Sequence, residues 1–468
     1  MRLLVVALLL GVSACSLEPA LDEPALPVAP AYPALPEQAS SATHAHDLGW
    51  RSMFGDPRLQ RSIELALDHN RDLRLAALQV EAVRAQYGIE RAARFPAVDA
   101  TGAVARQRAA ANDQIALASP SEVRTEYAVN IGLAAFEIDL FGRMRSMSDA
   151  AFARYVASEH GRKAAQIALV AAVAEAYFAE RLAQEQTALA ERTLRDWKQS
   201  LDLARQLQAA HQNSGLDVAQ AEGQVATAEA ELEVHTRTAA QAGNALRLLM
   251  GTELPADVPA ALPLDEQSVV TQLPPGLPSE LLVHRPDILQ AEQNLRAANA
   301  DIGAARAAFF PRLSLTSSIG YASPDLSNLF DDRQRAWNFA PQLTLPLFQG
   351  GRLRSELRLA EVRKLSAVAE YERAIQIAFR EVADGLAVNV TFDRQIDAQR
   401  RAVASAERRV ALSNLRYRAG VDGRLELLDS QRQLSSAQLA LLASRRDAIG
   451  NAIALYRALG GGLLENGR

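Results

Sequence analysis

The sequence predicts a mixed, mostly α-helical protein in which two internal repeats each combine long helices with two β-strands. Residues 143–212 and 352–419 each contain no proline and a single glycine, which predicts two very long helices. In each half of the chain a Phe-Pro pair ends a helical pattern, and alternating apolar and polar residues follow it. The usual globular helix has about 11 to 12 residues, so a single globular domain does not explain this pattern.

The N-terminus predicts export and a lipid anchor. Residues 1–14 hold one basic residue, an apolar run and small residues before Cys15, the layout of a cleaved lipoprotein signal peptide. Cys15 is the only cysteine, so no disulfide can form within one chain. The position of Cys15 after Val12, Ser13 and Ala14 resembles the lipobox of bacterial lipoproteins. We therefore expect Cys15 to be the lipidated mature N-terminus, and the resemblance implies that Ser16 favours sorting to the outer membrane. The alternative is an ordinary signal peptide followed by an incidental cysteine.

Two proline-rich segments divide the mature chain. Residues 15–47 predict an extended tether, and residues 255–278 predict a linker between the two repeats. Loss of Arg2 with the signal leaves 49 basic against 55 acidic residues, a net charge of −6, without any concentrated basic run. Nucleic acid is therefore not an expected partner.

The first repeat covers residues 48–254. It opens with one helical segment from Leu59 to Arg94, continues as strands near 96–108 and 124–140, and closes with the long helix and a return helix from Leu216 to Met250. The apolar side of the second strand is expected to consist of Tyr127, Val129, Ile131, Leu133 and Ala135.

The second repeat covers residues 279–462 and has the same order of elements. A helical segment from Ser279 to Phe309 precedes strands near 311–323 and 335–347. The long helix 352–419 then turns back at a glycine into a final helix from Arg424 to Leu459.

The four strands have the length that crosses a bilayer when tilted, about nine to eleven residues. Strands in hydrocarbon must form a closed barrel, because an unpaired edge leaves backbone groups without partners. The smallest bacterial barrels have about eight strands, so we expect the chain to oligomerise. Two copies would supply eight strands and three would supply twelve, and the strand count alone does not choose between them.

One segment carries a family resemblance, which two other parts of the chain support. The stretch LLVHRPDILQAEQNLRAANADIGAARAAFFPRLSL resembles the hallmark segment of the outer-membrane efflux protein family, the TolC-like channels, in the lipoprotein NodT-type branch of RND efflux systems. The residues that carry the resemblance there are Arg285, Pro286, Asp287, Ile288, Ala291, Glu292, Ile302, Gly303, Phe310 and Pro311. Support comes from Trp50, Phe54, Asp56, Pro57, Asn70, Asp72 and Leu73, and from Tyr417, Arg418, Ala419, Gly420, Leu428, Asp429, Gln431, Arg432, Ala437 and Gln438.

The resemblance implies a homotrimer with a twelve-stranded barrel in the outer membrane, continued by a long periplasmic α-helical barrel. It also implies the function: the outer-membrane exit duct of a tripartite efflux pump, which passes small molecules from an inner-membrane RND-type transporter and a periplasmic adaptor (membrane fusion protein) to the exterior. The substrate is left open among drugs, solvents, metal ions and aromatic acids.

Three carboxylates at the second helical turn are the candidate site. Asp422, Glu426 and Asp429 are spaced by four and three residues, so a helix would place them along one face. By resemblance this turn is the periplasmic gate. Three-fold repetition would bring like charges together and raise some of their pKa values. The supporting residues of the turn are Tyr417, Arg418, Gly420 and Arg424, of which Arg418 and Arg424 are expected to pair with the acids. The alternative is a solvated helix start, with Asp422 complementing the helix dipole.

The sequence contains no recognisable catalytic, phosphate-binding or metal-binding motif, so we expect neither an enzyme nor a metal or other cofactor beyond the lipid on Cys15. Two other functions remain as alternatives. One is the outer-membrane duct of a type I protein secretion system. The other is a lipid-anchored helical envelope scaffold without a pore, for which the four alternating segments would have no purpose.

Overall fold

The computed structural model describes residues 17–21, 24–30, 32, 46–108, 123–212, 214–271, 273 and 280–466. They form two compact units, and each unit draws on both halves of the sequence. The first, here called the sheet unit, comprises Val80–Ser158, Ala291–Tyr371 and the described residues up to Pro24. The second, the helical unit, comprises Ala25–Gln79, Glu159–Gln290 and Glu372–Arg468. The compact units therefore cut across the two repeats expected along the sequence.

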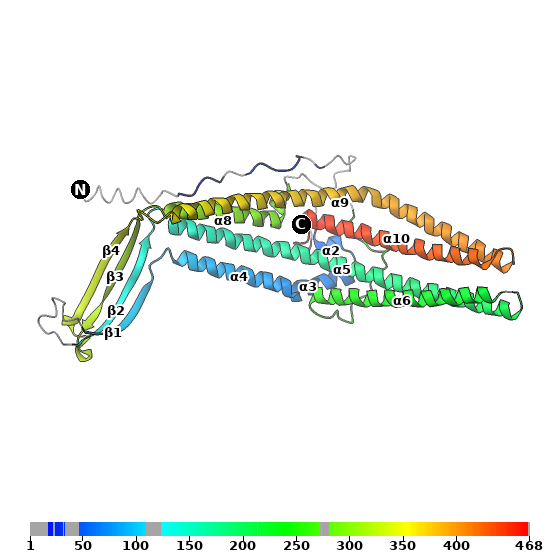
Figure 1. Cartoon of the computed structure of the whole chain (residues 1–468), viewed down its shortest axis with the longest axis horizontal. Coiled ribbons are helices and arrows are strands. Elements are labelled where there is room, and N and C mark those ends of the chain that lie inside the picture. Colours follow the sequence, from blue (N-terminus) through cyan, green and yellow to red (C-terminus); the bar gives the residue numbers. More distant parts are fainter. Residues whose placement is uncertain are drawn as a thin grey trace. The chain divides into compact units, whose positions relative to one another are not determined.

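Helices dominate the chain, and four strands interrupt them in two pairs (Figure 1). The strands are β1 (Val98–Arg108), β2 (Val123–Ile138), β3 (Arg312–Ser323) and β4 (Arg335–Thr344). The helices are α2 (Trp50–Met53), α3 (Pro57–His69), α4 (Arg71–Ala92), α5 (Arg143–Ala209), α6 (Gly215–Met250), α7 (Glu280–His284), α8 (Pro286–Ala307), α9 (Arg352–Arg418) and α10 (Arg424–Ala458). Within the described ranges, no helix combines the length and the apolar character needed to cross a bilayer.

The sheet is antiparallel and its strands lie in chain order, β1-β2-β3-β4. Each half of the chain contributes one pair of adjacent strands. The pairing of β2 with β3, from Tyr127 opposite Ser323 to Ile138 opposite Leu313, joins the two pairs into one sheet. The outer edges of β1 and β4 have no strand beside them within the described part of the chain.

The two faces of the sheet differ in chemistry. Residues directly opposite each other on neighbouring strands share a face, and the register gathers the large apolar side chains on one of them. This apolar face holds Val98, Val104, Tyr127, Val129, Ile131, Leu133, Phe136, Ile138, Leu313, Leu315, Ile319, Tyr321, Trp337, Phe339 and Leu343. Small and polar residues occupy the other face, among them Thr101, Asn130, Ser314, Ser318, Asn338 and Gln342.

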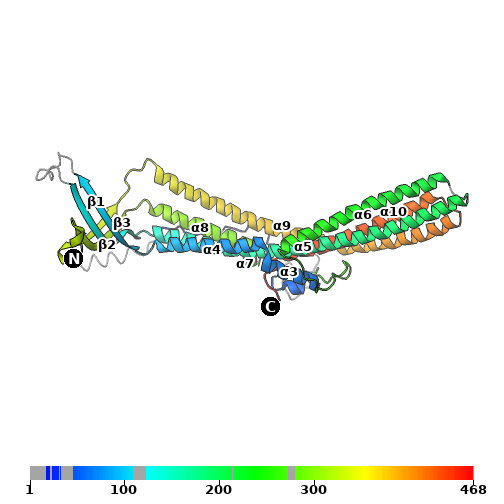
Figure 2. The same cartoon turned by 90° about the horizontal axis from the view of Figure 1, so that it is seen from below.

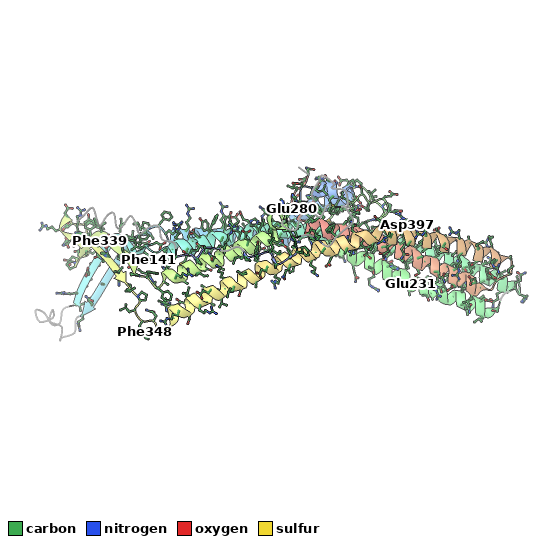
Figure 3. The ribbon with its side chains drawn as sticks, turned by 90° about the horizontal axis from the view of Figure 1, so that it is seen from above. Phe141, Glu231, Glu280, Phe339, Phe348 and Asp397 are labelled. Atoms are coloured by element: carbon green, nitrogen blue, oxygen red, sulfur yellow. The ribbon has the colours of Figure 1, made fainter. Side chains whose placement is uncertain are left out.

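Much of the apolar face is exposed in the single chain. Trp337 is 78% exposed, and Phe348, which follows β4, is 88% exposed. Figure 3 shows the side chains of Phe141, Phe339 and Phe348 in the sheet unit. Phe141 stacks on Phe310 with ring centroids 4.7 Å apart. An exposed apolar surface of this extent indicates contact with lipid or with another protein surface.

A β-bulge in β2 corrects the expected alternation of that strand. Leu133 lies opposite Ser317, but the next apolar pair is Phe136 opposite Leu315, so β2 holds one extra residue. Ala135 adopts a strained left-handed backbone conformation, with φ of 51°. Its backbone N–H donates a hydrogen bond to Thr316 Oγ1 at 3.2 Å. The expectation that Ala135 continues the apolar side was wrong, because the bulge puts Phe136 and Ile138 there.

The bulge also determines which face of the sheet carries the carboxylate of Glu137. Glu137 falls on the polar face, opposite Ser314, where it accepts a hydrogen bond from Arg143 Nε at 2.9 Å. Without the extra residue, period-two alternation would turn Glu137 to the apolar face.

The segment expected as one helix from Leu59 to Arg94 is broken at Asn70, between α3 and α4. Asn70 is 5% exposed, and its Oδ1 accepts from the N–H of Leu73 at 2.9 Å, which caps the start of α4. Its Nδ2 donates to the carbonyl of Leu249 at 2.8 Å, so the same side chain holds the end of α6.

A second break occurs at Arg285, between α7 and α8, where Pro286 occupies the first position of the new helix. The side chain of Arg285 is 8% exposed and forms ion pairs with Asp287 at 2.5 Å and Glu381 at 2.8 Å. Both breaks therefore occur at buried polar side chains that contact other elements.

The proline-rich linker is fastened to the helical unit through Asp56, which is 1% exposed. Its carboxylate accepts hydrogen bonds from the Tyr177 hydroxyl at 2.6 Å, from Gln267 Nε2 at 2.9 Å and from the N–H of Leu262 at 3.3 Å. Burial, together with the hydrogen bond that its hydroxyl donates to the Asp56 carboxylate, raises the pKa of Tyr177. One buried carboxylate thus joins α3, α5 and the linker.

We expect Gly320→Ala to destabilise the sheet, because a Cβ there would lie 2.0 Å from the carbonyl oxygen of Val129. Overpacking of this kind typically costs about 1–3 kcal/mol. Thermal unfolding of the purified protein measures the effect, with Gly102→Ala as the control, since a Cβ at Gly102 meets nothing within 4 Å. Equal loss of stability in both variants would contradict the steric explanation.

Candidate functional site

The turn between α9 and α10 is closed by backbone hydrogen bonds that require a glycine. The N–H of Val421 donates to the carbonyl of Arg416, and the N–H of Gly420 donates to that of Tyr417, both at 3.0 Å. This pair of bonds is the Schellman motif, which needs a left-handed residue after the helix. Gly420 supplies it with φ of 70°.

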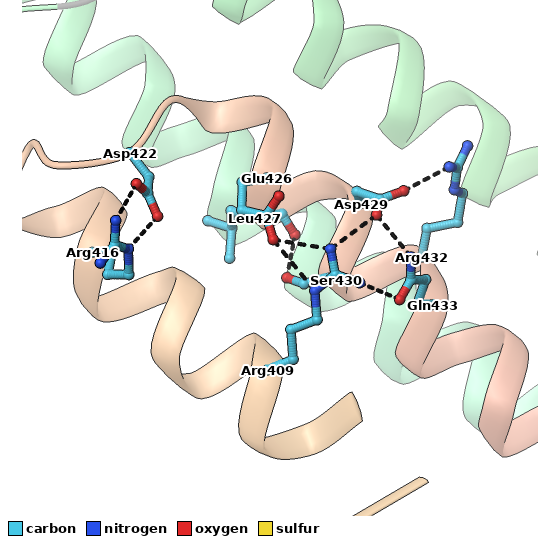
Figure 4. A network of polar contacts seen from close by, with 9 residues as sticks. All are labelled: Arg409, Arg416, Asp422, Glu426, Leu427, Asp429, Ser430, Arg432 and Gln433. Carbon is cyan, nitrogen blue, oxygen red and sulfur yellow. Dashed lines mark hydrogen bonds and ion pairs between the residues drawn. The ribbon is translucent and has the colours of Figure 1, made fainter. Parts of the chain in front are cut away.

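All three predicted carboxylates lie at this turn, and each meets an arginine of α9 (Figure 4). Asp422 is held by two hydrogen bonds from the Arg416 guanidinium, of which that from Nη2 to Oδ1 measures 2.7 Å. Arg409 Nη2 lies 2.9 Å from Glu426 and 3.2 Å from Asp429. The arginines therefore link the last three turns of α9 to the start of α10.

Asp429 has further partners on its own helix. Arg432 Nη2 lies 2.7 Å from Asp429 Oδ1, and Gln433 Nε2 donates to Asp429 Oδ2 at 2.8 Å. Within one chain the three carboxylates are matched by three arginines, so the cluster has little net charge.

Within one chain, the nearest charges to these groups are of opposite sign. The hydrogen bonds from Arg416 hold the pKa of Asp422 below its usual range, and the hydrogen bond to Glu426 raises the pKa of Arg409. The raised pKa values expected from a three-fold arrangement of the carboxylates concern the assembled oligomer and stay a prediction.

The expected partners of the acids were also wrong. Arg418 is exposed and makes no ion pair with a described residue. Arg424 is 3% exposed and points away from the acids: its Nη1 and Nη2 donate to the Ser200 carbonyl at 3.2 Å, and Nη2 donates to Ser200 Oγ at 3.1 Å. Arg424 therefore ties α10 to α5.

An apolar contact reinforces this tie between the two helical hairpins, α5–α6 and α9–α10, which lie side by side in the helical unit (Figures 1 and 2). Leu428 of α10 packs against the buried cluster that joins α5 to α6. That cluster consists of Leu194, Trp197, Leu201, Ala204, Ala221, Val225 and Ala228. The remaining predicted residue, Tyr417, has a buried hydroxyl without a hydrogen-bond partner among the described residues.

The α5–α6 turn is built differently. Ser214 Oγ accepts from the N–H of Asp217 at 3.3 Å, while Asp217 Oδ2 accepts from the N–H of Ser214 at 3.1 Å, which makes a capping box. Arg205 and Glu222 pair across this hairpin at 2.8 Å. Asp217 therefore caps a helix, while Glu222 is the acid of this turn that meets an arginine.

The sequence reasoning missed Arg409, Arg416 and Ser200 as members of the site. A signal for two of them was present: Arg416 and Asp422 stand three residues on either side of Ala419, and Arg409 and Asp429 stand ten residues on either side. Residues equidistant from the turn of an antiparallel hairpin lie at the same height, so opposite charges there are expected to meet.

No group of three or more His, Cys, Asp or Glu side chains is arranged to hold a metal ion in the described ranges. Cys15 lies outside the described residues.

A match to known proteins covers both halves of the chain. The family model described as outer membrane efflux protein matches residues 62–252 and 277–461. The chain is 44% identical over 468 residues to the probable efflux pump outer membrane protein TtgC of Pseudomonas putida, covering 99% of this chain and 96% of that protein. It is 45% identical over 459 residues to the outer membrane protein OprJ of Pseudomonas aeruginosa, covering 98% and 95% of the two chains. The crystal structure of the open state of the Neisseria gonorrhoeae MtrE outer membrane channel matches with a TM-score of 0.89 and 40% identity, covering 97% of this chain and 100% of that one.

We expect the charge reversal Arg416→Asp to loosen the α9–α10 turn, because it replaces an ion pair with two repelling carboxylates. Hydrogen–deuterium exchange of residues 410–430 should speed up by a few-fold, and the swap Arg416→Asp with Asp422→Arg should restore most of the protection. Arg432→Ala is the matched control, since it removes a pair within α10 only. Failure of the swap to restore protection would exclude the ion pair as the cause.

The lowered pKa of Asp422 also predicts a pH dependence. A carboxylate with a depressed folded-state pKa stabilises the fold above its unfolded pKa of about 3.9, and this contribution is lost as pH falls through the folded value. The difference in exchange at the turn between wild type and Asp422→Asn should therefore be constant from about pH 5 to 8 and vanish only in stronger acid. A difference that already fades near pH 6 would show that Asp422 does not keep the low pKa.

Proposed function

The chain belongs to the outer membrane efflux protein family, and from this premise we propose how it works as the outer-membrane exit duct of a tripartite efflux pump. Three copies assemble into one duct, with a twelve-stranded barrel in the outer membrane and a helical tunnel in the periplasm. The duct is passive and carries out no enzymatic reaction or cofactor chemistry.

The observation that carries this proposal is the sheet. It has one apolar face, one face of small and polar residues, and two edges that no described strand covers. In hydrocarbon each uncovered backbone group costs several kcal/mol, so the β1 edge of one copy must pair with the β4 edge of the next. Three four-stranded sheets then close a barrel whose apolar face meets lipid and whose polar face lines the pore.

The contacts of the first described residues after Cys15 support a lipid anchor on that cysteine. The first described residues pack against α8 in the sheet unit: Asn299 Nδ2 donates to Glu18 Oε1 and to the carbonyl of Pro19, both at 2.9 Å. Gly303 leaves room for this segment, because a Cβ there would lie 3.1 Å from Glu18 Cα. We propose that Cys15 carries the lipid, palmitate included, and that this segment holds the lipidated end beside the barrel.

The gate in this proposal is the α9–α10 turn with Asp422, Glu426 and Asp429. Two arginines hold the carboxylates to α9, and Arg424 holds α10 to α5. In the trimer these links keep the periplasmic ends of the helices together, with Tyr417, Arg418 and Gly420 completing the turn. Engagement of the periplasmic adaptor and the RND-type transporter replaces the links and lets the α9–α10 hairpin move outward.

Conductance in planar bilayers tests the duct and its gate together. We expect a small single-channel conductance from the full-length lipoprotein and a several-fold larger one from the variant Asp422→Asn, Glu426→Asn, Asp429→Asn, because the cross-links to Arg409 and Arg416 are lost. Glu229→Gln is the control, since it removes a comparable exposed ion pair, with Lys198, on the α5–α6 hairpin.

The outcomes separate the two parts of the proposal. An unchanged conductance in the triple variant would keep the pore and exclude these carboxylates as the gate. The absence of conductance from folded, membrane-inserted trimers would overturn the duct itself.

A further inference from the structure

The apolar face of the sheet ends in arginines at the side away from the helices. β1 and β3 run away from the helices that precede them, so the C-terminal ends of β1 and β3 and the N-terminal ends of β2 and β4 form the distal end of the sheet. Arg106 and Arg108 are the last residues of β1 on the face that carries Val104, and Arg335 is the first residue of β4 on the face that carries Trp337.

The register shows that these three side chains share the apolar face. Arg106 lies opposite Thr125, and Arg108 lies opposite Val123, two and four residues before the apolar-face residue Tyr127. Arg335 lies opposite Tyr321. Alternation of side chains with period two then places all three arginines on the same side as the apolar residues.

Three aromatic residues of the apolar face lie beside the arginines. Tyr321 is directly opposite Arg335, and Trp337 follows Arg335 by two residues on β4. Tyr127 lies opposite Val104, two residues before Arg106. Aromatic and cationic side chains therefore occur together at the distal end of this face, as they do where a membrane protein passes from hydrocarbon to the headgroups.

The three arginines are available to bind an anion. All three are exposed, and none forms an ion pair or hydrogen bond with a described side chain. The opposite end of the sheet is different, because Arg143 is there paired with Glu137. Among the described residues, then, no side chain balances the charge of these guanidinium groups on the apolar face.

We propose that Arg106, Arg108 and Arg335 bind the phosphate groups of lipids in the outer leaflet. The inference rests on the proposed function, in which this sheet crosses the outer membrane with its distal end outside. A guanidinium matches a phosphate by two parallel hydrogen bonds. A charge on the lipid face is tolerated at the interface but costs about 2–4 kcal/mol at the bilayer centre, so the distal position suits these residues. Both outer edge strands carry the site, so it occurs beside every seam between copies.

Lipid titration of the purified full-length trimer in neutral detergent tests the proposal. The probe is diphosphorylated lipid A, counted by native mass spectrometry, with dephosphorylated lipid A as the second ligand. We expect Arg106→Gln, Arg108→Gln, Arg335→Gln to weaken binding of the diphosphorylated lipid by about tenfold or more, since each basic side chain near a lipid surface contributes about 1 kcal/mol. The corresponding triple lysine variant should retain most of the binding.

Arg124→Gln is the matched control. Arg124 is exposed at the same end of the sheet but lies opposite Gln107, on the polar face. Equal binding by wild type and the triple glutamine variant, or an equal loss in Arg124→Gln, would overturn the proposal. So would equal affinity of wild type for the phosphorylated and dephosphorylated lipids.

Conductance of the same preparations separates this inference from the proposed function. A conducting pore with arginine-independent lipid binding leaves the duct intact and removes the lipid site. Arginine-dependent binding without any conductance removes the duct and keeps the lipid site.

Discussion

The structure depends on one requirement: every backbone N–H and C=O of a strand in hydrocarbon must have a partner. Among the described residues, β2 and β3 meet this requirement on both sides, whereas β1 and β4 meet it on one side only. In the proposed duct, each chain therefore supplies one segment of a barrel. The oligomer is then part of the fold, because neighbouring copies satisfy the hydrogen bonds that remain at the two edges.

A second constraint, the alternation of side chains between the two faces of the sheet, explains why the sheet tolerates a strained residue. A strand that is buried in lipid on one face and wet on the other cannot change the parity of its side chains without cost. The bulge at Ala135 changes the parity once, and it does so where the apolar residues give way to the Glu137–Arg143 pair near the helices. The local strain is offset because Phe136 and Ile138 stay in the apolar layer.

Sequence patterns revealed the features that depend on composition. Pro96 and Pro311 lie two residues and one residue before the strands β1 and β3, and the scarcity of glycine and proline marks α5 and α9. Features that depend on a single side chain were missed. Ala135 adopts a left-handed conformation, which an alanine in an alternating pattern does not predict. Asn70 fits a continuous helical pattern unless its ability to cap a helix is considered. The partners of Asp422, Glu426 and Asp429 were misassigned because neighbours in sequence were preferred to residues at equal distance from the turn.

The pairing of β2 with β3 also constrains how the chain can be made. Tyr127 and Ser323 are neighbours in the sheet but stand far apart in the sequence, and residues 139 to 311 separate the two strands. At a synthesis rate of about 5–20 residues per second, the first strand pair waits roughly ten seconds or more for its neighbour to be translated. During that interval an apolar strand edge is uncovered, which makes the nascent chain prone to aggregation. The order of the elements thus means that the four-stranded sheet can be completed only after the second half of the chain is available.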